Sequence, residues 1–402
     1  MPPTIRIQLS AMMFFEFLVW GAWYVTMGTY LTSTLHASGA QNGAAYGAVA
    51  VATIISPFIV GMIADRYFAA QKFMGVLHLM GGVLLLLSTQ IKDPNAFFWI
   101  ILAYAAVYMP TIALSNSVAF NQMTDPEKEF SGIRVWGTLG WIVIGLVIGW
   151  LKISGVENVA TTVIPFQLAA AASFVFGIYC FFLPNTPPKA QSSTGVSNVL
   201  GLDALVLFKD RSYLVFFIAS ILICIPLSFY YSFTNPFLTD TGMVNATGKM
   251  TMGQMSEVIF MILLPVFFAR LGIKYILLLA MLAWIARFTG FAFGNAGDGI
   301  WLLYLGIILH GLCFDFFFVA GMIYTETKAG PRIKNAAQGL ITFATYGVGM
   351  FIGTILSGWV YDVNKSGGKL DWQSFWLFPV YLTIGILVFF LLFFREKNKA
   401  VK

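Results

Sequence analysis

Charged residues are scarce in this sequence. Only 10% of its 402 residues are Asp, Glu, Lys or Arg, whereas 59% are hydrophobic. Globular domains usually contain about a quarter charged residues, so this composition excludes an ordinary water-soluble fold and indicates a membrane protein with several spans. The net charge of +6 does not indicate nucleic-acid binding, because the basic residues lie in short loops between apolar runs.

Cysteines and catalytic motifs are also few. Cys180, Cys224 and Cys313 lie inside apolar runs without metal-ligand spacing, which indicates packing rather than disulfides or a metal site. HExxH and CxxC motifs are absent, and no Ser or Cys has a plausible paired histidine. We therefore expect neither an enzyme nor a metal or other cofactor. The N-terminus lacks the cleavage site of a removable signal peptide, and residues 14–31 are expected to belong to the first span.

Long apolar runs make up most of the chain. A run of ~20 apolar residues matches the thickness of the hydrocarbon core of a bilayer. The sequence predicts an all-α membrane protein with twelve transmembrane helices, at 9–33, 42–64, 71–90, 94–117, 131–154, 159–183, 212–238, 249–271, 273–294, 299–325, 334–361 and 371–394.

The distribution of Lys and Arg predicts the topology. If the N-terminus is cytoplasmic, sixteen of the 23 basic residues fall in inside segments, five fall in outside segments, and Arg134 and Arg287 lie within spans. This excess follows the positive-inside rule. We therefore expect both termini to be cytoplasmic.

A polar segment divides the spans into two sets of six. The sequence predicts an N-terminal six-helix bundle at 1–183, a cytoplasmic connector at 184–211 and a C-terminal six-helix bundle at 212–402. This is the layout of major facilitator transporters, whose substrate site lies near the bilayer midplane. The loop GMIADRYF at 61–68 looks like a shortened form of the loop motif of that superfamily, although a loop that merely carries charge is the alternative. The number of spans by itself does not exclude a twelve-helix channel or a membrane enzyme.

Arg134 lies at the start of the fifth span. A charge within the hydrocarbon core costs ~3 kcal/mol or more, so this side chain is expected to face protein or water. Thr138 and Trp141 follow it at helical spacings of four and three, which places all three on one stripe of the helix. We expect Arg134 to act as a charge partner or inner gate, and Thr138 and Trp141 to contact substrate.

Two further spans carry carboxylates. Asp315 lies among phenylalanines in the tenth span, where it either takes up and releases a proton or makes a structural hydrogen bond. Glu257 in the eighth span shares a helix face with Gln254, three residues earlier. An amide beside a carboxylate suits a ligand with hydroxyl groups, although bonding between helices is the alternative.

Four other ionisable residues lie within spans. Glu16 is either a second protonatable group or the partner of a cation. Arg287 has no obvious ligand partner in the sequence and is expected to be structural. His78 and His310 are expected to be packing residues rather than proton carriers.

The seventh span has a polar run between Pro226 and Pro236. It includes Ser228, Tyr231 and Asn235. Because proline bends a span and frees backbone carbonyls, this helix is expected to form a gate or one wall of a binding site.

An ordered set of short segments runs along nearly the whole chain: Trp20–Trp23 (WGAW), Tyr108–Thr111 (YMPT), Arg134–Gly140 (RVWGTLG), Leu200–Ala204 (LGLDA), Leu207–Lys209 (LFK), Ser256–Glu257 (SE), Phe314–Phe317 (FDFF), Ala337–Gly339 (AQG) and Asp371–Gln373 (DWQ). This ordered set resembles one family, the bacterial nucleoside:proton symporters of the major facilitator superfamily.

The resemblance implies proton-driven uptake of nucleosides across the bacterial inner membrane. The family's binding residues carry over as Arg134, Thr138, Gln254, Glu257, Phe314 and Asp315, and Trp141 stands where the family can have another aromatic ring. Ser228 and Tyr231 stand where the best-known members have glutamine and asparagine, which leaves the nucleobase preference open. Glu16 replaces a glutamine, which adds a possible protonation site.

The expected mechanism is alternating access with the proton as the coupling ion. Asp315 is the first candidate for the proton carrier, with Glu257 or Glu16 second, and Arg134 is the expected charge partner. The expected partners are a nucleoside and the lipid bilayer, without nucleic acid, and the expected assembly is a monomer. A proton symporter for sugars or another polyhydroxylated solute is the alternative, whereas a channel is disfavoured because the charged residues form no repeated ring.

Overall fold

The chain is built almost entirely of helices and divides into two compact units. The computed structural model describes residues 1–59, 67–124, 126–187 and 202–395. The units are Met1–Thr194 with Asn245–Thr251, and Gly195–Val244 with Met252–Lys402. The bundle limits at 183 and 212 stay a prediction. The charged part of the loop motif at 61–68 and connector residues 188–201 lie outside the described residues.

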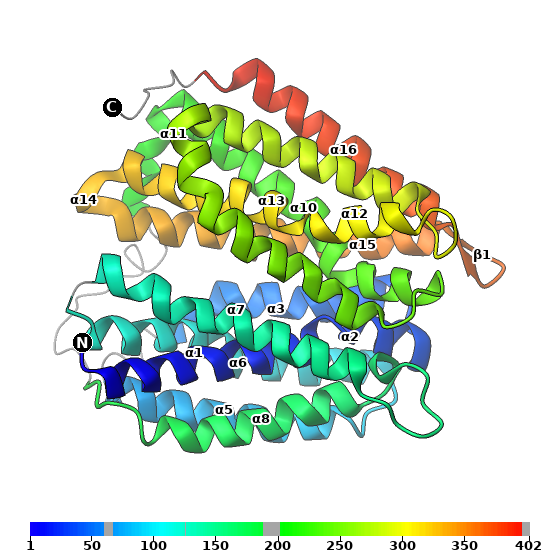
Figure 1. Cartoon of the computed structure of the whole chain (residues 1–402), viewed down its shortest axis with the longest axis horizontal. Helices are drawn as coiled ribbons and strands as arrows, with labels where there is room; N and C mark the ends of the chain where they lie inside the picture. Colours follow the sequence, from blue (N-terminus) through cyan, green and yellow to red (C-terminus); the bar gives the residue numbers. More distant parts are fainter. Residues whose placement is uncertain (60–66, 125, 188–201, 396–402) are drawn as a thin grey trace. The chain divides into compact units, whose positions relative to one another are not determined.

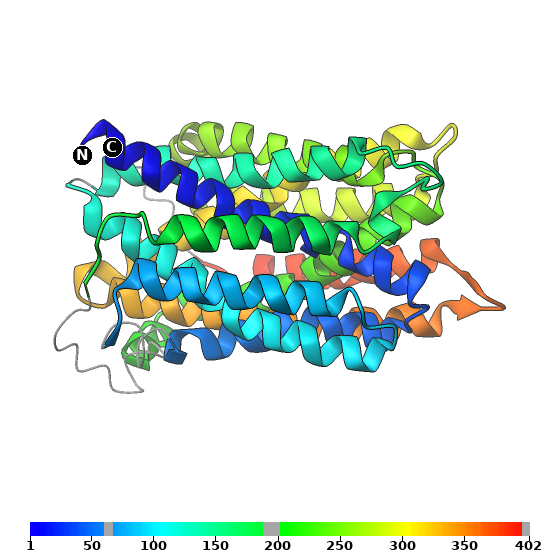
Figure 2. The ribbon, with the colours of Figure 1, turned by 90° about the horizontal axis from the view of Figure 1, so that it is seen from below.

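The first unit contains most of the N-terminal half. Its elements are α1 (Pro3–Tyr24), α2 (Met27–Thr29), η1 (Tyr30–Thr34), α3 (Gly39–Ile59), α5 (Ala70–Ser88), α6 (Pro94–Gln122), α7 (Pro126–Trp150), η3 (Val159–Thr161) and α8 (Ile164–Cys180). Helix α1 packs against α7 and α8, and α5 packs against α6 and α8 (Figure 1). Figure 2 shows dark-blue α1, light-blue α5 and green α8 running along a common direction.

The second unit contains the remaining helices and one short hairpin, except that residues 246–251 at the start of α11 (Ala246–Phe293) belong to the first unit. Its elements are η4 (Leu202–Lys209), α10 (Arg211–Asp240), α11 (Ala246–Phe293), α12 (Ile300–Ile308), α13 (His310–Phe314), η5 (Asp315–Val319), α14 (Ala320–Thr342), η6 (Phe343–Gly349), α15 (Met350–Val363), β1 (Lys365–Ser366), β2 (Lys369–Leu370) and α16 (Trp372–Phe393). Strands β1 and β2 pair antiparallel, with Lys365 opposite Leu370. Helix α10 packs against both α15 and α16.

Two glycines divide long helical stretches into separate spans. Gly272 within α11 has φ 72°, and Gly330 within α14 has φ 66°. A positive φ strains residues that have a side chain but not glycine, so a glycine in this conformation commonly ends a helix. The chain therefore turns at 272 and at 330, where the sequence predicts loops between the eighth and ninth and between the tenth and eleventh spans.

The twelve predicted spans are confirmed in the part of the chain that the structure describes. Nine helical stretches there are long and apolar enough to cross a membrane, and one of them, 246–293, contains two spans divided at Gly272. Helix α3 and the shorter apolar helix α8 complete the twelve. Large apolar side chains on the outer surfaces of these helices are exposed, including Trp99, Ile178, Ile262, Trp359 and Leu392, as expected for helices that face lipid.

The predicted ends of the fifth and sixth spans are wrong by several residues. Helix α7 ends at Trp150 rather than at 154, and α8 begins at Ile164 rather than at 159. Between them, Ile153 pairs with Val156 in an isolated bridge around Gly155, whose φ is 75°. Backbone conformation at this turn decides where α7 ends and where α8 begins, which is why hydropathy alone misplaced these limits.

Candidate functional site

The stripe on α7 lies against α1 in the first unit. The guanidinium carbon of Arg134 is 3.9 Å from the centroid of the Phe17 ring, and the half-buried Trp141 ring meets Trp20 edge-on at 5.6 Å. Trp141 also lies 6.4 Å from Tyr24. Cation–π contact with an aromatic face stabilises a cation that has left bulk water. Helix α1 therefore holds the side chains of the predicted stripe in place.

Small residues allow this close contact between α1 and α7. A Cβ atom at Gly140 would collide with the carbonyl oxygen of Phe14, and one at Gly21 would come within 3.0 Å of the Trp141 ring. Glycine at such crossings lets helix backbones approach closely in lipid. Thr138 lies on the same helix and is half-buried.

Asp315 has an unusual position in the second unit. It begins the π-helical segment η5, and its side chain is fully buried. Neither carboxylate oxygen has a hydrogen-bond partner among the described residues. π-helical turns are rare and are often found at functional sites, and a buried carboxyl without partners is costly when ionised. The surroundings of Asp315 therefore favour its neutral, protonated form over the ionised form.

Gln254 and Glu257 lie on the part of α11 that packs against α13. A Cβ atom at Gly311 would collide with the backbone of Ser256 and Glu257, and the Gly311 amide donates to the Ser256 hydroxyl at 3.0 Å. Gln254 is buried and Glu257 is half-buried. The structure thus brings the predicted amide and carboxylate beside the helix that leads into Phe314 and Asp315, and Glu257 lies within electrostatic range of Asp315.

Phe314 joins a group of rings next to a buried cation. It lies 5.8 Å from His310 and 5.2 Å from Phe318. His310 stacks on Tyr230 at 5.0 Å, and its Nδ1 is 3.0 Å from the Arg287 guanidinium. The expectation that Arg287 and His310 have structural roles agrees with this packing, although the contact between them was not visible in the sequence, where they are 23 residues apart.

Arg287 itself is only partly satisfied. Its guanidinium carbon lies 3.4 Å from the centroid of the Tyr230 ring and its side chain is fully buried. Its Nε and Nη2 have no hydrogen-bond partner within the described ranges. The cation–π contact and the histidine therefore replace the carboxylate that usually accompanies a buried arginine.

The two predicted contacts on α10 occupy different environments. Ser228 is fully buried, and its hydroxyl lies 2.9 Å from the Cys224 carbonyl oxygen and 3.2 Å from that of Met350. This places Ser228 in the packing of α10 against α15. Tyr231 is half-buried and lies 5.5 Å from Tyr230, next to the aromatic group around His310.

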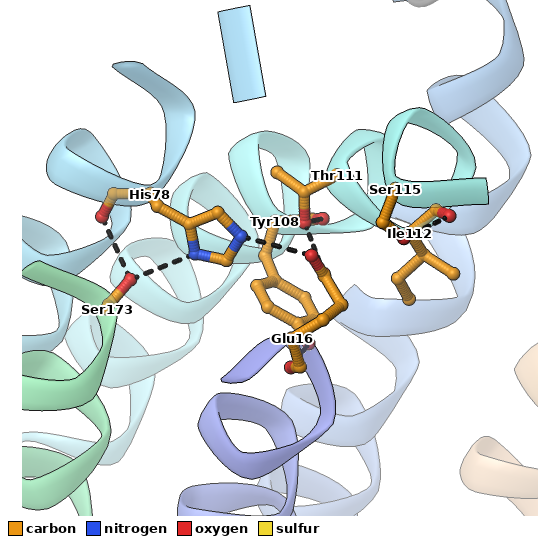
Figure 3. Close-up of polar contacts among 7 residues, drawn as sticks. All are labelled: Glu16, His78, Tyr108, Thr111, Ile112, Ser115 and Ser173. Atoms are coloured by element: carbon orange, nitrogen blue, oxygen red, sulfur yellow. Dashed lines mark hydrogen bonds and ion pairs between the residues drawn. The ribbon is translucent and has the colours of Figure 1, made fainter. Parts of the chain in front are cut away.

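Glu16 is surrounded by partners inside the first unit. Its Oε2 is 3.3 Å from His78 Nε2, and its Oε1 is 2.6 Å from the Thr111 hydroxyl (Figure 3). The Tyr108 hydroxyl donates to the Glu16 carbonyl oxygen at 2.6 Å, and His78 Nδ1 is 3.2 Å from the Ser173 hydroxyl. All of these side chains are buried. Glu16 therefore has a potential cationic partner, which was one of the two alternatives for this residue.

His78, Thr111 and Ser173 were not predicted to act with Glu16. They come from α5, α6 and α8, and a single sequence gives no spacing rule that pairs residues on different helices. The only available signal was the presence of an acid and a histidine within apolar runs, since burial of either favours a partner.

Comparisons with known proteins agree on one family. Residues 3–399 match the family described as "Nucleoside H+ symporter". The chain is 42% identical to the putative nucleoside transporter YegT of Escherichia coli (strain K12), over 98% of this chain and 95% of that protein. It is 35% identical to the xanthosine permease of the same organism, over 96% and 95% of the two chains. The crystal structure of the nucleoside transporter NupG matches 98% of this chain and 100% of its own, with 32% identity and a TM-score of 0.87.

Proposed function

Because this chain belongs to the nucleoside H+ symporter family and has the major facilitator fold, we propose that it takes up nucleosides with protons by alternating access. It is a multi-pass membrane transporter and not an enzyme. The observation that carries the proposed coupling is Asp315, a fully buried carboxyl without a hydrogen-bond partner among the described residues.

The nucleobase stacks on Trp141 or Phe314 in this proposal. Every base has a π-face, and stacking on an aromatic side chain is worth ~1–3 kcal/mol in single-stranded nucleic-acid complexes. Thr138 is placed one turn from Trp141 on the same stripe and contributes a hydroxyl. Tyr231, half-buried beside Tyr230, is the proposed contact from α10.

The ribose hydroxyls are held by Gln254 and Glu257. They lie three residues apart on α11, whose backbone at Ser256 and Glu257 packs against Gly311 of α13, so helical spacing offers one amide and one carboxylate on one helix face. An amide donates and accepts, and a carboxylate accepts, which matches neighbouring hydroxyl groups. A ligand without these hydroxyls leaves buried polar groups unpaired, at about 1–3 kcal/mol each.

Asp315 carries the coupled proton. Outside, the protonated acid permits nucleoside binding; inside, loss of the proton restores its negative charge. Arg134 is a further residue that we propose to act in coupling. Glu257 and Glu16 are the second candidates for proton binding. The proposed location is the bacterial inner membrane, with both termini cytoplasmic and the chain acting as a monomer.

The test of the carrier is uptake of labelled uridine into proteoliposomes under an imposed pH gradient. We expect Asp315→Asn to lose concentrative uptake by at least about tenfold, because the amide cannot release a proton, while exchange of uridine across the membrane without a gradient continues. Concentrative uptake at the wild-type level by Asp315→Asn would rule out this assignment.

A second uptake assay separates the ligand classes. Glu257→Gln is expected to weaken uridine binding by about 10–100-fold through loss of a charge-assisted hydrogen bond worth ~1.5–3 kcal/mol. Unlabelled nucleosides, free sugars and free bases then compete with labelled uridine for the wild-type protein. If sugars alone inhibit uptake by the wild type, the protein is a sugar symporter and the nucleoside proposal is wrong. If Glu257→Gln binds uridine normally, Glu257 does not contact the ribose.

A further inference from the structure

The hydrogen atoms around His78 can be counted. Ser173 has one hydroxyl hydrogen, and its oxygen is 2.9 Å from the His78 carbonyl oxygen and 3.2 Å from His78 Nδ1 (Figure 3). When Ser173 donates to the carbonyl, its oxygen can only accept from the ring, so Nδ1 must carry a hydrogen. The local geometry therefore links the ring tautomer to the direction of one hydroxyl.

The opposite ring nitrogen faces an acid. His78 Nε2 is 3.3 Å from Glu16 Oε2, and both side chains are fully buried. With a hydrogen on Nδ1, a bare Nε2 facing an ionised carboxylate would place two lone pairs against each other. A proton therefore lies between them, either on Nε2 as part of an imidazolium or on Glu16 as part of a neutral carboxyl.

The other oxygen of Glu16 allows both possibilities. The Thr111 hydroxyl oxygen is 2.6 Å from Glu16 Oε1 and also 2.6 Å from the Tyr108 carbonyl oxygen. When the proton lies between Oε2 and Nε2, Oε1 carries no hydrogen, so it accepts from the Thr111 hydroxyl whether the proton is on Glu16 or on His78. Thr111 thus holds the carboxyl group in place in both cases.

From this geometry we infer that Glu16 and His78 form a proton-binding site inside the first unit, separate from Asp315, with Ser173 as a hydroxyl switch and Thr111 as a donor to Glu16 in both states. With the proton bound, the pair is neutral overall and Ser173 donates to the His78 carbonyl. When the proton leaves, Ser173 turns to donate to Nδ1, the remaining ring hydrogen moves to Nε2 and donates to Glu16, and the pair carries one negative charge.

Among the described residues, few other titratable groups face this pair. Tyr104 and Tyr108 of α6 and Cys180 of α8 lie within electrostatic range of Glu16. Arg134 of α7 is the cation within range of Tyr108, and its guanidinium rests on Phe17, the residue after Glu16. Release of the proton therefore places a buried negative charge near the cation of the predicted substrate stripe, which is the physical link to transport.

The test follows the histidine rings directly by NMR of the full-length protein labelled with nitrogen-15 at histidine. The chain has three histidines, so His36→Gln and His310→Gln identify the His78 signals. His36 is exposed and serves as the internal control. We expect His78 to carry a hydrogen on Nδ1 at low pH and to convert to the Nε2–H tautomer as the pH is raised. A His78 ring that keeps one tautomer from about pH 5 to 9 would overturn the inference.

Two variants connect this titration to its cause. In Glu16→Gln the tautomer change should disappear, because an amide cannot share the proton. In Ser173→Ala it should move in pH, because Nδ1 loses its hydroxyl partner. A tautomer change that is the same in the wild type and in both variants would also contradict the proposal. If the variants are unstable, the wild-type titration alone decides it.

The contribution of this site to coupling rests on the proposed function and is measured separately. We expect His78→Gln to change the pH dependence of uridine uptake, with a smaller loss than Asp315→Asn. If the wild type does not transport uridine, the nucleoside proposal fails while the His78 titration still stands. If uptake is normal and its pH profile is the same in His78→Gln, the link to coupling is refuted.

Discussion

The two units treat a buried carboxyl group in opposite ways. In the first, Glu16 is enclosed by a histidine and a threonine hydroxyl, and Tyr108 fixes its backbone. In the second, Asp315 is equally buried but its oxygens have no hydrogen-bond partner among the described residues. A satisfied carboxyl ties helices together, whereas an unsatisfied one is stable mainly when neutral. The difference indicates that Glu16, besides binding a proton as inferred above, ties the helices of the first unit together, whereas Asp315 adds no hydrogen bond among the described residues.

The largest loss of stability is expected from a substitution at Gly311, where α13 packs against the backbone of Glu257 in the second unit. In Gly311→Ala the new Cβ would collide with backbone atoms of Ser256 and Glu257, which cannot rotate away. We expect a loss of about 3 kcal/mol of unfolding free energy, near the upper end for overpacking, in thermal unfolding of the purified protein. Gly385→Ala is the matched control, because nothing lies within 4 Å of its Cβ. Equal stability of the two variants would mean that α11 and α13 do not pack as described.

Exchange of each carboxyl for its amide tests the comparison itself. Glu16→Gln should lower the unfolding free energy by about 2 kcal/mol, because the His78 and Thr111 contacts lose their charge-assisted or shared-proton character. Asp315→Asn should leave it unchanged or raise it slightly, since no described hydrogen bond is lost. The measurement is thermal unfolding of both variants in the same detergent. A larger loss in Asp315→Asn than in Glu16→Gln would reverse the comparison.

A third carboxylate, outside the spans, is expected to have the smallest effect. Asp210 accepts hydrogen bonds from the Ser212 and Tyr213 amides at the start of α10, and pairs with Lys328 at 2.7 Å. Partial burial by itself raises the pKa of the Asp210 carboxyl, but the Lys328 ammonium and the two amides outweigh it and hold the pKa below the usual 3.8. The stabilisation is therefore present above pH 3.8 and is lost as the pH falls through the lowered value.

Asp210→Asn keeps a capping side chain and removes only the charge. We expect a loss below about 1 kcal/mol near neutral pH, because exposed ion pairs contribute little, and a smaller difference from the wild type in strong acid. Measuring the unfolding free energy of the wild type and the variant at several pH values tests both expectations. If instead the difference in unfolding free energy between the wild type and Asp210→Asn grows as the pH falls below 3.8, the assigned direction of the pKa shift is wrong.

Much of the fold was predictable from hydropathy. The number of spans follows from the length of apolar runs, and the turns at Gly272 and Gly330 lie where the sequence predicts loops. The end of α7 and the start of α8 were misplaced, because the turn around Gly155 is decided by backbone conformation, which hydropathy does not report. Less of the candidate site could be predicted. Helical spacing places Gln254 and Glu257 on one face, but it does not show that the Ser228 hydroxyl lies 3.2 Å from the Met350 carbonyl oxygen; substrate contact by Ser228 stays a prediction.

The sequence by itself determined the class of protein, the number of spans and the family resemblance, because apolar run length and short motifs are local properties of the chain. Only the tertiary structure decided which polar residues have partners. Glu16 and His78 are 62 residues apart, and Arg287 and His310 are 23 apart. Their contacts depend on how helices pack and rotate, which no local spacing specifies. Glu16, with its hydrogen-bond partners, and Asp315, without one in the part of the chain that the structure describes, look alike in sequence as acids within apolar spans and differ in what the folded helices place around them.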